Sequence, residues 1–191
     1  MNKNHKRLLP PKLLHRHAKR IRLLLSDIDG VLTNGTLYYV PDGKGGIVEA
    51  KGFNSQDGMG FRWLQEAGIL AGWISGRESP GVVARAQILQ ISYLYQNHLS
   101  KVGPYEEILQ KAQVVDEEVC YLGDDLTDSP LLSRVGLAVA VANAVPEVKK
   151  HAHYVTRAPG GSGAAREVIE ILLKAQGHWD PILRKYGLPA T

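Results

Sequence analysis

The sequence predicts an α/β fold: a doubly wound, Rossmann-like parallel sheet with helices on both faces. Continuous apolar runs end in acidic or hydroxyl residues at 23–26, 69–75 and 119–124. Parallel strands that are covered on both faces need such runs, and the intervals between them hold the crossover helices that a parallel sheet requires. At 191 residues, the chain has the length of one domain.

Two carboxylates follow the first apolar run. Leu23–Leu25 leads to Asp27 and Asp29, and Gly30 indicates that the strand ends there. Ligands of open α/β sheets bind just beyond the carboxyl ends of the strands. Two unpaired carboxylates in apolar surroundings repel, so either a cation binds between them or one holds a proton. A plain surface turn is the alternative, because Asp and Gly favour turns.

A second acidic strand end follows the run 119–122. Gly123 is succeeded by Asp124, Asp125 and Asp128. This number of hard oxygen ligands suits Mg2+, which takes one or two carboxylates together with water and a substrate phosphate. Helix capping is the alternative interpretation for Asp125, because an Asp at a helix start meets free N–H groups.

Two candidate phosphate-binding segments lie between the acidic strand ends. Ser75, Gly76 and Arg77 follow the second apolar run and offer a hydroxyl, accessible backbone N–H groups and a guanidinium. Lys101 follows the next run. A lone lysine is ordinarily a solvated surface charge, so Lys101 is a candidate site residue only because it lies between the Ser75 motif and the second acidic motif.

Taken in order, these motifs resemble the haloacid dehalogenase superfamily of phosphohydrolases. The family pattern is D-x-D-x-[TV], then Ser or Thr, then Lys, then an acidic G-D-D-x-x-x-D motif. The chain supplies Asp27-Ile28-Asp29-Gly30-Val31, Ser75, Lys101 and Gly123-Asp124-Asp125-Leu126-Thr127-Asp128 in that order.

The resemblance implies a role for each matching residue. Asp27 would be the nucleophile and Asp29 the general acid and base, while Ser75 and Lys101 would hold the transferring phosphoryl oxygens. Mg2+ would bind through Asp27, the backbone carbonyl of Asp29, and Asp124. Asp125 and Asp128 would support this centre.

The short interval between Asp29 and Ser75 leaves no room for the cap domain that many superfamily members insert. Two β-prone runs joined by Gly, Pro and Asp predict a hairpin at about residues 35–54. A lone two-stranded ribbon is marginal in water. In the capless members that the chain resembles, such hairpins assemble a homotetramer in which a neighbour covers the active site.

The closer resemblance is to the capless 3-deoxy-D-manno-octulosonate 8-phosphate phosphatases, over residues 21–173. Its most distinctive stretch is 158–167, in which a glycine-rich segment precedes Arg166. Arg77 and Arg166 could pair with the carboxylate of an acidic sugar, and Gly76 and Thr33 are further candidate substrate contacts. As the alternative, the glycines form only a flexible loop before a helix that Ser162 caps. The implied activity is hydrolysis of a sugar acid phosphate in lipopolysaccharide precursor synthesis.

The chain departs from the family pattern at Ser55-Gln56 and Asn97-His98. These departures leave the catalytic carboxylates unchanged and concern which sugar acid is the substrate. Two alternatives stay open. One is a phosphatase for another 2-keto-3-deoxy acid phosphate, such as a nine-carbon acid 9-phosphate. The other is a non-catalytic oligomeric binding domain of the same fold.

The chain divides into a basic extension at 1–20, a core at 21–176 and a tail at 177–191. The extension carries lysines and arginines without any Asp or Glu. A solvated tail is favoured, and nucleic acid is not expected as a partner. No apolar stretch is long enough to span a membrane. The single cysteine, Cys120, lies in a predicted core strand, which points to an inert thiol and a cytoplasmic location.

Overall fold

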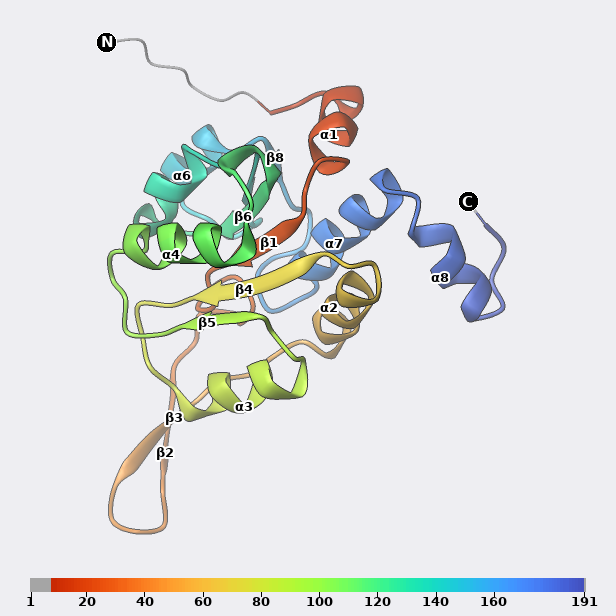
Figure 1. Cartoon of the computed structure of the whole chain (residues 1–191). Helices are drawn as coiled ribbons and strands as arrows, with labels where there is room; N and C mark the ends of the chain where they lie inside the picture. Colours follow the sequence, from red (N-terminus) through yellow and green to blue (C-terminus); the bar gives the residue numbers. More distant parts are fainter. Residues whose placement is uncertain (1–7, 191) are drawn as a thin grey trace, which may run out of the picture.

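The computed structural model describes residues 8–190, which form a six-stranded parallel sheet with helices on both faces (Figure 1). Its strand order is β5-β4-β1-β6-β7-β8. The strands are β1 Leu23–Ser26, β4 Leu70–Ile74, β5 Tyr93–Tyr95, β6 Val119–Gly123, β7 Leu137–Ala140 and β8 Tyr154–Val155. The predicted doubly wound fold is confirmed.

Helices cover the two faces of the sheet in separate groups. In Figure 1, α2 and α7 pack together on one side of β1, and α4 and α6 lie on the other. The helices are α1 Pro11–Ala18, α2 Ser55–Glu66, α3 Pro80–Ile88, α4 Val102–Ala112, α5 Ser129–Leu132, α6 Pro146–His151, α7 Ala164–Ala175 and α8 Trp179–Lys185. Two 3-10 turns, η1 Asp116–Glu118 and η2 Leu126–Asp128, complete the elements.

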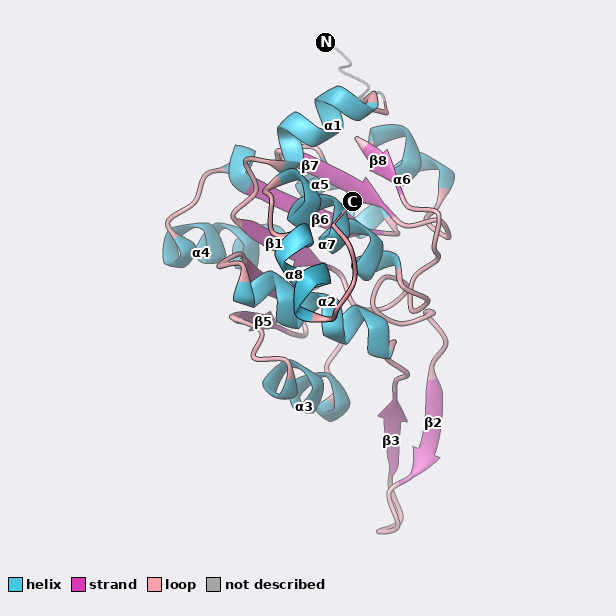
Figure 2. Cartoon of the chain, turned by 90° about the vertical axis from the view of Figure 1, so that its right-hand side faces the viewer, coloured by secondary structure: helices cyan, strands magenta, loops and turns pink. Residues whose placement is uncertain are grey.

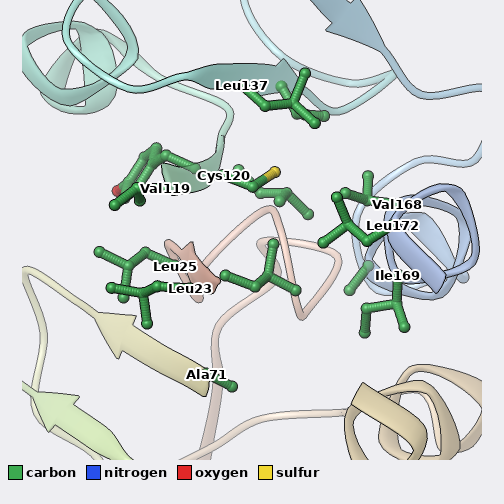
Figure 3. Packing of buried hydrophobic residues seen from close by; sticks show 14 of the residues in the cluster. Leu23, Leu25, Ala71, Val119, Cys120, Leu137, Val168, Ile169 and Leu172 are labelled. Carbon is green, nitrogen blue, oxygen red and sulfur yellow. The ribbon is translucent and has the colours of Figure 1, made fainter. Parts of the chain in front are cut away.

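The apolar strand residues form a core between the helical layers. Leu23 and Leu25 of β1 are fully buried, and Figure 3 shows them in the same packed cluster as Val168 and Leu172 of α7. Each such side chain contributes about 1.5–3 kcal/mol when it is removed from water. Cys120 lies in the same core and is buried, which agrees with the expected inert thiol.

β1 and β6 lie side by side at the point where the strand order reverses, that is, where strands begin to be added on the other side of β1. From β1 the chain runs outward through β4 and β5, and then returns to β6 and continues through β7 and β8. Leu25 is in register with Tyr121, so both strands end at the same edge of the sheet. Ligands of doubly wound sheets bind at this switch point.

The predicted hairpin consists of β2 Tyr38–Pro41 and β3 Ile47–Ala50, which pair only with each other. It projects from the body of the molecule, as Figure 2 shows. Tyr39 and Ile47 on it are 62 % and 73 % exposed. Between β1 and β4 the described chain holds only this hairpin and α2, so no cap domain is inserted there, as the sequence predicts.

Both chain ends differ from the tails that the sequence favours. Residues 1–7 lie outside the described residues, but α1 packs on α7, with Ala18 buried and Leu14 against the core. At the other end, Trp179 of α8 packs edge-on against Trp63 of α2, with ring centroids 5.7 Å apart. Each segment has a few apolar residues that face the core, while the basic side chains of α1 and its end, Lys12, Arg16, Lys19 and Arg20, stay exposed. No helix among the described residues is long and apolar enough to cross a membrane.

Candidate active site

The first candidate loop leaves the buried strand β1. Asp27 extends the parallel ladder by donating its backbone N–H to Leu122 O at 3.0 Å, and its own Oδ1 accepts the N–H of Ile28 at 2.7 Å. The chain then turns sharply at Gly30, which has φ +88°. A β-carbon at Gly30 would lie 2.1 Å from Asp124 Oδ2, so glycine is required both by the backbone angle and by this close approach.

Lys101 connects the nucleophile candidate with the second acidic motif. Its Nζ lies 3.0 Å from Asp27 Oδ1 and 2.6 Å from Asp128 Oδ1, and its side chain is 2 % exposed. Burial lowers the pKa of Lys101, but Asp128 and Asp27 outweigh this effect and raise it. Lys101 is therefore a buried, charged lysine, in contrast to the solvated charge that a lone lysine usually represents.

Asp128 holds the acidic motif in place and is wholly buried. Its Oδ1 accepts from Lys101 and from the Tyr121 hydroxyl at 2.7 Å, and its Oδ2 accepts the backbone N–H groups of Asp124 and Asp125 at 2.9 and 3.2 Å. With both oxygens engaged, Asp128 organises its neighbours. This agrees with the supporting role that the resemblance implies.

Three carboxylates meet around a single lysine. One oxygen from each of Asp27, Asp124 and Asp128 lies within 4.8 Å of the others, the one such acidic group among residues 8–190. Burial raises the pKa of Asp27 to about 6, against the opposing effect of Lys101. Burial, with the charges of Asp27 and Asp128, raises the pKa of Asp124 to about 7.

The acidic cluster fits a hard divalent cation. Asp124 Oδ1 is buried and has no hydrogen-bond partner. The cluster carries three carboxylates against one ammonium, and burial, together with the neighbouring carboxylates, raises the pKa values of Asp27 and Asp124. Oxygen ligands of this kind suit Mg2+. Asp27 and Asp124 are the side chains that would hold it.

The Ser75 motif lies at the end of the neighbouring strand β4. Ser75 is buried, and its Oγ accepts the Arg77 N–H at 3.0 Å. Gly76 and Arg77 face a cavity of about 410 Å³ over the carboxyl ends of the strands. The cavity is lined by Asp27, Asp29, Gly76, Arg77, Leu99, Lys101, Asp124, Asp125 and Thr127. Carboxylates, the ammonium group of Lys101 and the guanidinium group of Arg77 thus surround one space that can hold a phosphate ester.

Comparisons with known proteins agree with this chemistry. Residues 84–168 match the family model described as haloacid dehalogenase-like hydrolase. The chain is 44 % identical over 163 residues to the 3-deoxy-D-manno-octulosonate 8-phosphate phosphatase of Escherichia coli, and the match covers 85 % of each chain. The chain belongs to this phosphatase family.

Solved structures of the family have the same fold. The Yersinia pestis 3-deoxy-D-manno-octulosonate 8-phosphate phosphatase is 42 % identical and has a TM-score of 0.83, with 87 % of this chain and 88 % of that chain covered. The Moraxella catarrhalis enzyme is 33 % identical with a TM-score of 0.86, covering 91 % and 97 %. That structure contains a magnesium ion, a phosphate ion and a KDO molecule. The resemblance drawn from the sequence is confirmed, and the predicted Mg2+ agrees with the metal of this relative.

Thr33 and Arg166, two of the predicted substrate contacts, do not line the cavity of the chain described above. Thr33 is buried, where its Oγ1 accepts the Gly35 N–H at 3.2 Å and stabilises the turn after the catalytic loop. The Arg166 guanidinium stacks 4.0 Å from the Trp63 ring, and its Nε lies 2.8 Å from Glu170. The structure thus gives both residues contacts within the chain, and their contact with substrate stays a prediction. Asp125 does line the cavity, and it also caps η2 by accepting the Leu126 N–H at 2.7 Å.

The glycine-rich segment approaches the catalytic loop rather than a ligand. Gly160 donates its N–H to Asn143 Oδ1 at 2.6 Å, and Asn143 Nδ2 donates to Gly30 O at 2.9 Å. Gly161 donates to Val31 O at 3.0 Å. A β-carbon at Gly160 would lie 1.8 Å from the Gly30 carbonyl oxygen. The glycines are therefore needed for close backbone packing that fixes the loop carrying Asp29.

Sequence reasoning missed two charged residues of the hairpin, Glu49 and Lys51. Lys51 Nζ forms an ion pair with Asp29 and lies 2.8 Å from Glu49 Oε1, and Glu49 Oε2 lies 3.6 Å from Arg77. Two signals were present: the spacing of the two residues, since residues two apart in an extended segment point to one side, and the stretch Lys51-Gly52-Phe53, which belongs to the family resemblance but gave Lys51 no role. Tyr121 was also missed, since its position in an apolar strand indicates packing alone.

Proposed function

We propose that the chain hydrolyses 3-deoxy-D-manno-octulosonate 8-phosphate to the free sugar acid and phosphate, as a step of lipopolysaccharide precursor synthesis. The observation that carries the proposal is the buried contact of Lys101 with Asp27 and Asp128, beside an unpartnered Asp124 oxygen. The names and the bound KDO and magnesium of the relatives support the substrate and the metal.

Asp27 is the proposed nucleophile. Its carboxylate oxygen attacks phosphorus, the ester P–O bond breaks, and Asp29 gives its proton to the departing sugar oxygen. Water then attacks phosphorus of the aspartyl-phosphate and gives a proton to Asp29, which releases phosphate and restores the Asp27 carboxylate. Ser75 and Lys101 bind the phosphoryl oxygens during both displacements.

Mg2+ would be held by Asp27, Asp124 and the backbone carbonyl of Asp29. When bound, it supplies positive charge to the phosphoryl oxygens, which is most of what phosphoryl transfer requires. Asp128 keeps Lys101 aimed at the phosphoryl site. Arg77, half-exposed at the cavity, is the proposed partner of the sugar acid carboxylate, next to Gly76.

A homotetramer assembled through the hairpin is part of the proposal. The hairpin exposes a set of large apolar side chains, although a free two-stranded ribbon is marginal in water. These side chains are Tyr38, Tyr39, Val40 and Ile47. A closed symmetric assembly would bury them and bring a neighbouring copy over the capless cavity.

The test is phosphate release from a panel of eight- and nine-carbon 2-keto-3-deoxy acid phosphates and common hexose phosphates, with Mg2+ and with a chelator. Asp27→Asn is the matched control, because it keeps the side-chain shape and removes the nucleophilic carboxylate. We expect Mg2+-dependent turnover that is fastest with the eight-carbon acid. Faster turnover of a nine-carbon acid phosphate would overturn the proposed assignment of the eight-carbon acid as substrate. No release above the Asp27→Asn background would favour a non-catalytic binding domain.

A further inference from the structure

Each proposed catalytic carboxylate has a lysine of its own. Lys101 contacts Asp27, and Lys51 forms an ion pair with Asp29. The Lys51 side chain is 1 % exposed, and Lys51 does not line the cavity. It therefore approaches Asp29 from behind, on the side away from the space where the phosphate ester would sit.

Glu49 holds Lys51 from the other side. Glu49 Oε1 lies 2.8 Å from Lys51 Nζ, and Glu49 Oε2 lies 3.6 Å from Arg77. An ammonium group has three donors, so Lys51 can serve both carboxylates at once. A buried lysine is costly unless it is paired, and the row Asp29, Lys51, Glu49, Arg77 alternates in sign along its length.

The chain next to Lys51 is firmly anchored. Two residues later, Phe53 stacks on Trp73 of β4, with ring centroids 6.2 Å apart and planes 12° apart. Asn54 then caps α2 by accepting the Gln56 N–H at 2.7 Å. Lys51 thus lies in the segment that joins β3 to this anchor, which gives its ammonium group a fixed origin close to Asp29.

We infer that Lys51 is a positioning residue, held by Glu49, that keeps the Asp29 carboxyl group aimed at the oxygen of the leaving group. The inference rests on the proposed function. Asp29 lines the open cavity, and its side chain is 20 % exposed, so without Lys51 its carboxyl group can rotate within this space. Proton transfer requires hydrogen-bond contact with the reacting oxygen, and a misplaced group loses most of its effect.

The test compares two esters that differ in their need for a proton. A sugar phosphate has an alkoxide leaving group that must be protonated, whereas the nitrophenolate of p-nitrophenyl phosphate leaves without help. For Lys51→Met, we expect kcat/KM on the sugar phosphate to fall by about 100-fold, as for a displaced general acid. On p-nitrophenyl phosphate we expect kcat/KM to fall by less than about threefold, because kcat/KM reports the first displacement, in which nitrophenolate leaves without a proton from Asp29. The second displacement, in which Asp29 accepts a proton from water, is the same for both esters. Asp29→Asn should show the same selectivity with a larger loss.

Two controls separate positioning from folding and from charge. Lys44→Met removes a lysine from the exposed hairpin turn and should leave both rates unchanged. Lys51→Arg keeps a charged donor and should recover the sugar phosphate rate to within about 10-fold of wild type. Should Lys51→Met fail to fold, Glu49→Gln, which weakens the contacts of Glu49 with Lys51 and with Arg77, should still lower kcat on the sugar phosphate selectively, by about 5–10-fold.

Equal losses on the two esters, or a rise in KM without a fall in kcat, would overturn the inference while leaving the proposed function intact. Failure of Lys51→Arg to recover any sugar phosphate activity would also count against it. If the wild-type protein turned over neither ester, the proposed function would fail, and the inference with it.

Discussion

Replacing Lys101 by Met should destabilise the protein in a way that depends on pH. The substitution keeps the length of the side chain but removes the one ammonium among three carboxylates whose oxygens lie within 4.8 Å of one another. Lys101 contacts Asp27 at 3.0 Å and Asp128 at 2.6 Å, and its side chain is 2 % exposed. Removal of one partner from a buried ion pair costs about 3–5 kcal/mol. For a domain of this size, the expected fall in Tm is on the order of 6–20 °C.

The sign of the pH effect follows from the carboxylates that remain. The pKa values of Asp27 and Asp124 are raised to about 6 and about 7, so the folded state binds their protons more tightly than the unfolded state does. Stability therefore falls as pH rises through this range. Lys101 opposes the rise at both residues, so its loss should cost most at about pH 8 and least at about pH 5, where the carboxylates are protonated.

The assay is thermal unfolding, followed by circular dichroism in the presence of a chelator, across this pH range. Lys111→Met is the matched control. It removes a lysine from the exposed face of the same helix, α4, where Lys111 pairs with Glu107 at 2.6 Å, and surface pairs contribute little. A Tm for Lys101→Met equal to that of the control, or a deficit that does not change with pH, would refute the reasoning.

Four further substitutions test other parts of the structure. Gly30→Ala should lower activity by at least about 100-fold and weaken Mg2+ binding, because the β-carbon of the alanine would displace the Asp124 carboxylate. Calorimetry measures the binding, and unchanged Mg2+ affinity would contradict this expectation. Asp57→Ala removes a buried acceptor that caps the first turn of α7, so Tm should fall by about 2–8 °C, equivalent to about 1–2 kcal/mol. Ser162→Ala should leave Tm unchanged, because the side chain of Ser162 makes no cap. Ile47→Asp should reduce the mass measured by light scattering to that of a single chain, and an unchanged mass would argue against assembly through the hairpin.

The core of the fold was predictable because its signals are local. Apolar runs such as 23–25 and 119–122 have the length and composition of buried parallel strands. Carboxyl ends of parallel strands share one edge, so the sequence could place Asp27 and Asp124 together. The structure agrees, with both residues lining one cavity at the junction of β1 and β6.

Contacts between distant segments were not predictable in the same way. Arg166 has the chemistry of a ligand for an acidic sugar, but its guanidinium group packs against the rings of Trp63 in α2 and Trp179 in α8. Those rings lie in segments that come together only when both helices pack on α7. The basic composition of α1 likewise concealed the few apolar side chains, such as Leu14, that fix it to the core.

The glycine segment and the hairpin illustrate a second limit. Glycine composition shows that the backbone can approach something closely, but it does not show what is approached. Here the partner of Gly160 and Gly161 is the catalytic loop itself. Lys51 was hidden for a related reason, because its contact with Asp29 depends on where the segment after the hairpin meets the loop after β1.

Asp27 is the proposed nucleophile of a Mg2+-dependent hydrolysis of a sugar acid phosphate. The most direct test of this role is the rate of phosphate release from 3-deoxy-D-manno-octulosonate 8-phosphate with Mg2+, measured side by side for the wild-type protein and Asp27→Asn after equal folding is verified by circular dichroism. We expect steady turnover by the wild-type protein, abolished by a chelator, and only background release by the variant. A wild-type rate no higher than that of Asp27→Asn, or a variant that keeps full activity, would contradict the account.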